Sequence, residues 1–203
     1  MNRQPTLTGE RLLLRPLRPD DWTALYAVAS DPLIWELHPS HDRWQEQLFR
    51  PFFDDAMAKG GALAVIDQSS GAIIGSSRFQ AYDPADGGSV EIGWTFLARS
   101  HWGGAYNAEL KRLMLDHALR VVERVDFRIG EANLRSRAAL EKIGGTLTDR
   151  TELAQTTSGL VPHVVYEITR QSFADGPLQR VERQIPFRFA PDWLNKFTIF
   201  TVF

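Results

Sequence analysis

Short apolar runs alternate along the chain with stretches in which apolar residues recur at helical spacing. Residues 11–17 form the first apolar run and predict a strand. From Trp22 to Ala29 the apolar residues recur as they do on one face of an amphipathic helix. Asp31-Pro32 is predicted to end that helix, since the residue before a proline avoids helical backbone angles. A second helix is predicted over residues 44–58.

Three further strands are predicted in close succession, over residues 62–67, 72–80 and 89–97. The segments between them, 69–71 and 83–88, are rich in the glycine, serine, aspartate and proline of tight turns. Strands that are joined by such short turns pair as antiparallel neighbours. This part of the chain is therefore predicted to form an antiparallel meander.

The second half of the chain is predicted to alternate helices and strands. A long helix over 104–122 is followed by a strand over 125–130 and a helix over 134–143. Strands over 145–153 and 163–170 close the domain. The strand–helix–strand succession indicates a βαβ unit. We predict an α/β fold with a central mixed, mostly antiparallel sheet of about seven strands, flanked by about four helices.

Composition excludes several classes of function. The 203 residues carry 23 basic and 25 acidic side chains, a formal net charge of −2, which argues against nucleic-acid binding through bulk positive charge. There is no cysteine, so the chain has no disulfide, no thiolate zinc site and no cysteine nucleophile. We see no signal-peptide pattern and no apolar stretch long enough to span a membrane. We therefore expect a cytoplasmic protein that binds neither nucleic acid nor a membrane.

The most informative segment is residues 90–107, where a strand leads into a glycine pair and then a long helix. The first turn of a helix leaves about four backbone N–H groups unpaired and carries partial positive charge. Gly103 and Gly104 would let a phosphate approach these N–H groups closely. The alternative is a turn that needs glycine only for its backbone angles. The glycine patterns of P-loop and dinucleotide sites are absent.

Several motifs, taken in order, resemble the GNAT (N-acetyltransferase) superfamily, and most closely the branch that includes the ribosomal-protein N-terminal acetyltransferases. Glu91-Ile-Gly-Trp94 resembles the family's fourth strand. Trp102-Gly-Gly-Ala-Tyr106 resembles its pyrophosphate loop. Asn133-x-x-Ser136 and the later Glu141-Lys-x-Gly144 resemble its last helix, and Thr8–Pro16 resembles the first strand of this branch.

This resemblance covers residues 12–170 and implies the three-layer GNAT fold with acetyl-CoA as co-substrate. It implies that the end of the fourth strand pairs with the pantetheine arm and that the glycine loop binds the pyrophosphate. The implied cofactor-binding residues are Thr95, Phe96, Leu97, Trp102, Gly103, Gly104, Ala105, Tyr106, Asn107 and Asn133. Asn133 is also a favourable helix N-cap from its residue type alone, and both roles can hold together.

Acetyl transfer to an amine requires a neutral amine, a polarised thioester carbonyl and a proton for the departing thiolate. Glu91 is the candidate general base, directly or through water, and the alternative is an exposed or capped strand glutamate without a role in catalysis. The resemblance places Ser136 near the thioester sulfur as the second catalytic candidate. Strict alternation along the strand predicts that one face carries Val90, Ile92 and Trp94 and the other Glu91, Gly93 and Thr95.

The sequence departs from the family pattern at two positions. Ser100 stands where the commoner loop signature has glutamine or arginine. Leu140 stands where many members have a tyrosine general acid, so position 140 cannot supply the proton. Ser136, Tyr106 and a bound water are then the candidate proton donors.

Residues 35–44 connect the first two predicted helices, a region that lines the acceptor cleft in the GNAT superfamily. The candidate acceptor-binding residues here are Trp35, His38 and Trp44. His38 and His41 are metal-ligand types, but Pro39 breaks the helical geometry that would bring them together. We therefore expect no metal site.

We expect an acetyl-CoA-dependent N-acetyltransferase that passes the acetyl group directly to a primary amine, without a covalent enzyme intermediate. The amine would belong to a protein N-terminus or to a small molecule. Two alternatives stay open. One is a non-catalytic acyl-CoA-binding sensor or interaction module, and the other is an acetyltransferase for aminoglycosides, polyamines or amino acids.

We divide the chain into a GNAT-like acetyltransferase domain, residues 1–172, and a C-terminal extension, residues 173–203. The extension is rich in aromatic side chains, which would promote aggregation if they were exposed. We expect it to pack on the domain or on a partner subunit. In the second case the protein would be a homodimer.

Overall fold

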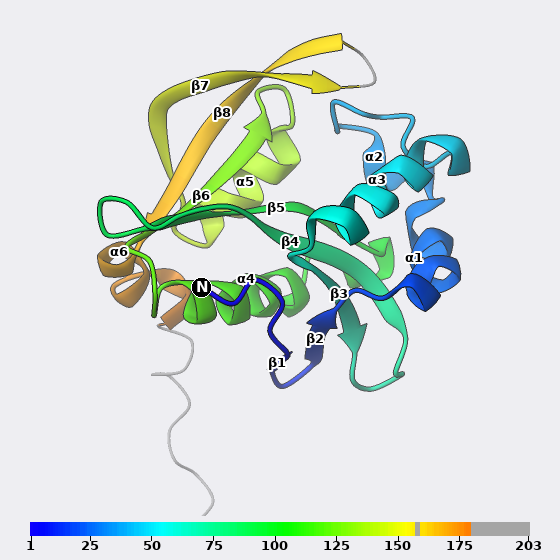
Figure 1. Ribbon diagram of the computed structural model, residues 1–203, viewed down its shortest axis with the longest axis horizontal. Coiled ribbons are helices and arrows are strands. Elements are labelled where there is room, and N and C mark those ends of the chain that lie inside the picture. Colours follow the sequence, from blue (N-terminus) through cyan, green and yellow to red (C-terminus); the bar gives the residue numbers. More distant parts are fainter. Residues whose placement is uncertain (157–158, 180–203) are drawn as a thin grey trace, which may run out of the picture.

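The computed structural model describes residues 1–156 and 159–179, which form one eight-stranded sheet with helices on both faces (Figure 1). The strands are β1 (Leu7–Thr8), β2 (Leu12–Pro16), β3 (Ala62–Asp67), β4 (Ile73–Asp83), β5 (Ser89–Leu97), β6 (Arg124–Gly130), β7 (Thr146–Thr156) and β8 (Gly159–Thr169). The α-helices are α1 (Trp22–Ala29), α2 (Pro32–Trp35), α3 (Glu46–Lys59), α4 (Ala105–Ala118), α5 (Leu134–Lys142) and α6 (Arg170–Ala174). Two short 3-10 helices, η1 (Pro19–Asp21) and η2 (Arg99–His101), precede α1 and α4.

The strand order is β1-β2-β3-β4-β5-β6-β8-β7. Neighbouring strands are antiparallel except for β5 and β6, which are parallel because α4 crosses over between them. This confirms the predicted mixed, mostly antiparallel α/β sheet and the predicted meander of β3, β4 and β5. The described residues contain one strand more than the seven predicted and six α-helices instead of four. The unpredicted elements β1, α2 and α6 are too short to produce a periodic pattern.

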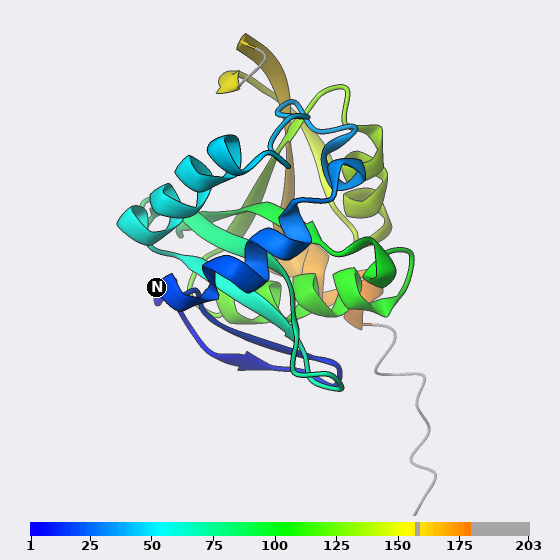
Figure 2. The ribbon, with the colours of Figure 1, turned by 90° about the vertical axis from the view of Figure 1, so that its right-hand side faces the viewer.

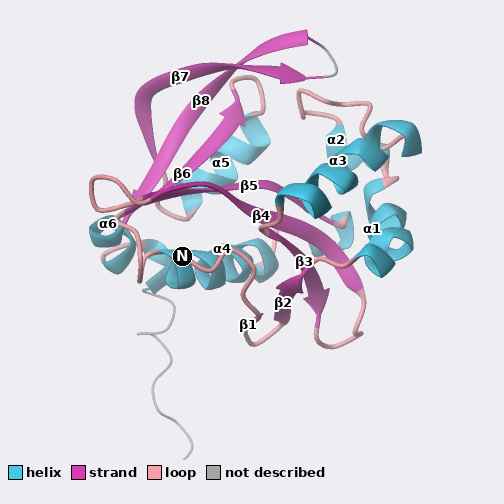
Figure 3. Cartoon of the chain, viewed as in Figure 1, coloured by secondary structure: helices cyan, strands magenta, loops and turns pink. Residues whose placement is uncertain are grey.

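The helices lie on opposite faces of the sheet (Figures 2 and 3). An apolar layer packs each group of helices against the sheet. One layer joins α4, α5 and α6 to the sheet through side chains such as Leu110, Met114 and Phe173. The other joins α1, α2 and α3 to it through side chains such as Leu25, Trp35 and Phe49. The sheet is therefore the middle layer of three.

Helix α2 starts where the first helix was predicted to stop. α1 does end just before Asp31-Pro32, as predicted. The Asp31 carboxylate then accepts a hydrogen bond from the backbone N–H of Leu33 and caps the new turn. Because proline is tolerated in the first turn of a helix, Pro32 begins α2 instead of preventing it.

The parallel pair β5 and β6 stays together only at its beginning. Residues 89–91 of β5 pair with residues 124–126 of β6, and the pairing stops at Glu91 and Asp126. β5 continues to Leu97 and β6 to Gly130. The two strands therefore diverge, and the fork between them lies inside the sheet.

A β-bulge at Trp94 accompanies this divergence. Trp94 has a φ of 58°, which is unusual for a bulky residue, and the register between β4 and β5 shifts beside it. Beyond the bulge Thr95 accepts a hydrogen bond from Lys111 of α4, whereas the Trp94 ring contacts Phe52 of α3. The predicted alternation was therefore wrong beyond Gly93, because the extra residue exchanges the faces of Trp94 and Thr95.

The predicted boundary of the C-terminal extension falls within α6. Phe173 and Leu178, both assigned to the extension, are buried against the main apolar layer. The remaining extension, residues 180–203, lies outside the described residues, so its predicted packing stays a prediction. Within the described part of the chain, no helix is long and apolar enough to cross a membrane.

The Glu109 side chain connects α4 to the start of β2. Its Oε1 accepts hydrogen bonds from the backbone N–H groups of Arg11, at 2.8 Å, and Leu12, at 3.1 Å. Its Oε2 lies 3.2 Å from the Arg11 guanidinium. A buried carboxylate that accepts one buried and one partly buried backbone N–H stabilises this contact more than an exposed ion pair does.

We predict that Glu109→Ala lowers the free energy of unfolding by about 2–3 kcal/mol, because two backbone donors lose their acceptor. Glu10→Ala is the matched control, since Glu10 also pairs with Arg11 but its side chain is exposed. That variant should cost less than about 0.5 kcal/mol. Chemical denaturation of the three proteins measures both values, and equal losses would contradict the assignment.

Candidate active site

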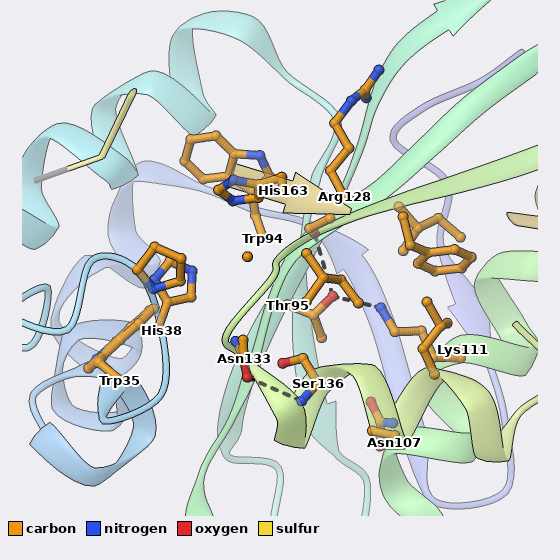
Figure 4. Close-up of a pocket in the computed structure, with 18 of the residues that line it drawn as sticks. Trp35, His38, Trp94, Thr95, Asn107, Lys111, Arg128, Asn133, Ser136 and His163 are labelled. Atoms are coloured by element: carbon orange, nitrogen blue, oxygen red, sulfur yellow. Dashed lines mark hydrogen bonds between the residues drawn. The ribbon is translucent and has the colours of Figure 1, made fainter. Parts of the chain in front are cut away.

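The fork between β5 and β6 opens into two adjoining cavities, a larger one of about 640 Å³ and a smaller one of about 180 Å³. They share one wall, to which β5, α4, α5 and the segment after α2 all contribute (Figure 4). The residues that line both cavities are Trp35, His38, Thr95, Asn107, Asn133, Ser136, Ala139 and Ile143. We call these residues the shared wall; they mark the place where the two cavities adjoin. A molecule in the larger cavity would therefore be next to a molecule in the smaller one at these residues.

The free edge of β5 forms one side of the larger cavity. Ala98 donates its backbone N–H to the Ile74 carbonyl of β4, at 2.7 Å, and Phe96 is paired with Ser76 of β4. Since backbone groups alternate in direction along a strand, Thr95 and Leu97 present theirs to the fork. The Trp102 indole N–H donates to the Leu97 carbonyl at 2.9 Å, in agreement with that direction.

The predicted glycine loop forms another part of the lining of the larger cavity. Gly103 and Gly104 both line it, and α4 begins at Ala105 with no side chain capping its first turn. Gly103 has a φ of 71°, which explains the need for glycine there. The uncapped N–H groups and the positive end of the helix dipole make this part of the cavity favourable for an anion.

Two cations stand beside the same cavity. The Arg135 guanidinium lies 4.4 Å from the centre of the Trp102 ring and donates to the Ile34 carbonyl at 2.9 Å. Lys142, in the last turn of α5, also lines the cavity. These charges add to the positive potential of the helix terminus.

Asn133 and Ser136 meet at the start of α5, on the shared wall. Asn133 is the N-cap, as predicted, and its side chain accepts from the Ser136 backbone N–H at 3.2 Å. Asn133 is buried, whereas the Ser136 hydroxyl makes no hydrogen bond to any described residue. Figure 4 shows both side chains beside Thr95 and across the pocket from His38.

Lys111 of α4 is buried and lines the smaller cavity. Its Nζ lies 2.7 Å from Thr95 Oγ1 (Figure 4). Thr95 Oγ1 is also within hydrogen-bond distance, 2.8 Å, of Ser77 Oγ. The ammonium group also stands 5.4 Å from the centre of the Phe127 ring. Burial lowers the pKa of Lys111 to about 7, because the charged form of the amine is removed from water.

His38 lies at the shared wall as a neutral imidazole. Its Nδ1 accepts the backbone N–H of Ser40 at 2.9 Å, so the ring proton is on Nε2. Burial, together with the nearby charge of Arg43, lowers the pKa of His38 to about 3. His38 can therefore donate a hydrogen bond to a ligand, but it is not a base at neutral pH.

The predicted site residues fall into two groups. Of the cofactor-binding candidates, eight line the larger cavity: Thr95, Phe96, Leu97, Trp102, Gly103, Gly104, Asn107 and Asn133. The remaining two, Ala105 and Tyr106, line neither cavity, and Tyr106 instead packs edge-on against His101 at 4.6 Å. Trp35 and His38 line both cavities, whereas Trp44 lies outside both and is partly exposed.

Glu91 is buried and lies next to the smaller cavity without lining it. Its carboxylate is in close contact with the Arg128 guanidinium, and Arg128 also binds Glu152 at 2.8 Å. Arg128 and Gly93 both line the cavity. Glu91 is therefore separated from the cavity by these two residues.

Sequence reasoning missed three cations of the smaller cavity, Lys111, Arg43 and Arg128. Lys111 lies four residues after Asn107 on the buried side of α4, so the two polar residues share a helix face. A polar pair of this kind on an apolar helix face is the signal that could have identified the site. Arg43 gave no such signal, because its environment comes from three different elements. No group of metal-ligating side chains occurs within residues 1–156 and 159–179.

Comparison with known proteins agrees with this geometry. Residues 11–146, more than half of the chain, match the sequence model of the acetyltransferase (GNAT) domain family. A GCN5-related N-acetyltransferase from Brucella melitensis is similar in structure, with a TM-score of 0.72 at 20% identity over 89% of this chain and 84% of that one.

Two similar structures contain CoA-type ligands. RimJ from Mycobacterium smegmatis, in complex with CoA-disulfide, has a TM-score of 0.67 at 19% identity over 88% of this chain and 94% of that one. Spermidine N-acetyltransferase from Vibrio cholerae, in complex with CoA and spermine, has a TM-score of 0.60 at 14% identity over 81% and 99%. At these identities the structures establish the shared fold, and the family match covers the fork, the glycine loop and α5. The chain is thus a member of the GNAT acetyltransferase family.

Proposed function

We propose that this protein is an N-acetyltransferase that uses acetyl-CoA and transfers the acetyl group directly to a primary amine. The observation that carries the proposal is the wall shared by the two cavities at Thr95, Asn107, Asn133 and Ser136. Direct transfer needs donor and acceptor to meet without an intervening protein nucleophile. Two cavities that meet at one wall provide this arrangement.

The residues around the larger cavity fit acetyl-CoA. Thr95 and Leu97 direct backbone groups toward the fork along a strand edge, which suits an extended chain with amide groups, although the Leu97 carbonyl already accepts from Trp102. The uncapped start of α4 suits the pyrophosphate, and Arg135 and Lys142 add positive charge for phosphate groups. Acetyl-CoA would supply the activated acetyl group as a thioester.

The reaction forms a C–N bond to the amine and breaks the C–S bond of the thioester. The ammonium form of the acceptor must lose a proton before attack, and the nitrogen loses a further proton on becoming an amide. The departing thiolate gains one proton. The chain must therefore accept protons on the amine side and supply one on the sulfur side.

Two groups can accept the proton of the amine. Lys111 lines the smaller cavity, is joined to Thr95 at the shared wall and is half-deprotonated near neutral pH. Glu91 can act only through water, because Arg128 and Gly93 stand between it and the cavity. We therefore propose Lys111 as the base and retain Glu91 as the alternative. The other ionisable groups lining this cavity are Arg43, Arg128, His38 and His163.

Ser136 is the proposed proton donor to the thiolate. Its hydroxyl is at the shared wall and has no described hydrogen-bond partner. Its position is fixed by the Asn133 cap through the backbone N–H, so the hydroxyl itself is available to a ligand. Asn133 then acts on the reaction by positioning Ser136 as well as by contacting the pantetheine arm.

Acetyl-CoA at one hundred times its Kd should stabilise the protein by about 2.7 kcal/mol, which raises Tm by several degrees. Gly103→Val should remove most of this shift, because its side chain and changed backbone would disturb the anion site. Gly71→Val is the matched control, with a φ of 72° and equal free space but a position in a distant turn. Absence of a shift in the unaltered protein would exclude both the enzyme and the acyl-CoA sensor.

We predict that kcat/KM rises with pH through about 7, since Lys111 accepts a proton only after losing its own and its pKa lies there. Lys111→Met should lose this rise and about a hundredfold in kcat, whereas Glu91→Gln should keep the rise. The pH profiles of the three proteins with one acceptor test this. Loss of the rise in Glu91→Gln alone would assign the base to Glu91.

Ser136→Ala should lower kcat about ten- to hundredfold, because the thiolate loses its proton donor, while the acetyl-CoA thermal shift stays unchanged. The cap by Asn133 uses the backbone N–H and is retained in this variant. Ser100→Ala is the control, since Ser100 lines neither of the two cavities. An unchanged kcat for Ser136→Ala would leave the proton to a bound water.

A further inference from the structure

The smaller cavity carries positive charge without matching negative charge. Its lining includes Arg43, Lys111 and Arg128, and among the described residues no aspartate or glutamate lines it. The larger cavity likewise has Arg135 and Lys142 and no described acidic lining residue. The charged side chains that line the two cavities are therefore all basic among the described residues.

Arg43 is the cation of the smaller cavity that stays charged at neutral pH without an ion pair to a described carboxylate, although the charge of its chain neighbour Asp42 acts on it. Arg128 is neutralised by Glu91 and Glu152. Lys111 loses its proton near neutral pH, because burial lowers its pKa to about 7. Burial also lowers the pKa of Arg43, to about 10, which leaves it charged at neutral pH.

Three aromatic rings hold the Arg43 guanidinium at the cavity. It lies 5.3 Å from the centre of the Trp35 ring, 4.9 Å from Phe52 and 5.7 Å from Trp94. These rings belong to α2, α3 and the bulge of β5, and all three line the same cavity. Stacking on rings restricts the side chain without using its N–H groups.

The hydrogen-bonding capacity of Arg43 is largely unused. A guanidinium has five N–H donors, and the contact of this one with a described side chain is a single hydrogen bond, 3.2 Å long, to Ser40 Oγ. It forms no ion pair with any described carboxylate. Holding a cation in an enclosed site without a carboxylate in direct contact is costly, so such a group indicates a charged ligand.

We propose that the acceptor is a primary amine that also carries a carboxylate, and that Arg43 binds this carboxylate. Arginine binds carboxylates through two parallel N–H···O bonds, which would fix the amine toward the shared wall. This inference rests on the proposed acetyltransferase function and names its substrate class. A free amino acid and a peptide N-terminus with an acidic side chain both supply this chemistry, and a cavity of about 180 Å³ admits only a small group of this kind.

The positive charges around the smaller cavity also favour the neutral, reactive form of the acceptor amine. A nearby cation disfavours an ammonium group, so it lowers the pKa of a bound amine and increases the neutral fraction that can attack. A polyamine or aminoglycoside would bring several positive charges into the same cavity. The site therefore favours an acceptor whose carboxylate offsets the charge of its own ammonium group.

Matched acceptors test the proposal in the intact protein with saturating acetyl-CoA. The pairs are β-alanine against β-alaninamide, and the amidated tripeptides serine–aspartate–alanine against serine–asparagine–alanine, with spermidine as a polycation. Thiol release gives kcat/KM, and calorimetry with CoA present gives acceptor binding. We expect the carboxylate member of at least one pair to be preferred about ten- to hundredfold. The pair that shows the preference identifies the source as an amino acid or a peptide.

Arg43→Gln should abolish that preference by raising KM for the carboxylate member alone, and Arg43→Lys should restore part of it. Arg50→Gln is the control, because Arg50 is exposed on α3 and pairs with Asp54 outside the cavity. The acetyl-CoA thermal shift verifies that each variant is folded. Equal use of acid and amide, equal losses on both, a preference for spermidine, or acetyl-CoA binding without binding of any carboxylate acceptor would each overturn the proposal. Failure of acetyl-CoA binding would instead remove the proposed function.

Discussion

The divergence of β5 from β6 is the constraint on which the rest of the site depends. Two parallel strands that pair at one end and separate at the other expose backbone N–H and C=O groups inside the sheet. The bulge at Trp94 directs β5 away and turns Thr95 toward α4. Both cavities, the free strand edge and the position of Lys111 follow from this single separation.

The same separation explains why cations can be placed in the interior of a small domain. An unpaired buried charge normally destabilises a fold by several kcal/mol. Here the destabilisation is reduced in two ways. Lys111 releases its proton near neutral pH, and the Arg43 guanidinium packs against three aromatic rings. Neither arrangement improves the packing of the core, which two apolar layers provide elsewhere. Their cost is therefore best explained by binding and chemistry at the fork.

Local patterns predicted much of the fold and several residues that line the larger cavity. The order of strands and helices, the Gly103-Gly104 turn and the Asn133 cap each depend on residues close together in the chain, so the sequence predicts them. Short elements such as α2 were not predicted, because a single helical turn is too short to show a repeating pattern of apolar residues. The alternation of β5 was predicted wrongly, because a bulge depends on the register with β4 and not on the strand's own residues.

By itself, the sequence determined the succession of elements, the family and the residues at the two helix starts, since these depend on local backbone preferences and on short motifs. Only the tertiary structure decided what surrounds Lys111 and Arg43. The burial that lowers the pKa of Lys111 comes from β5 and β6, and the rings around Arg43 come from α2, α3 and β5. The charge of a cavity is a sum over residues distant in sequence, so it becomes visible only when the chain is folded.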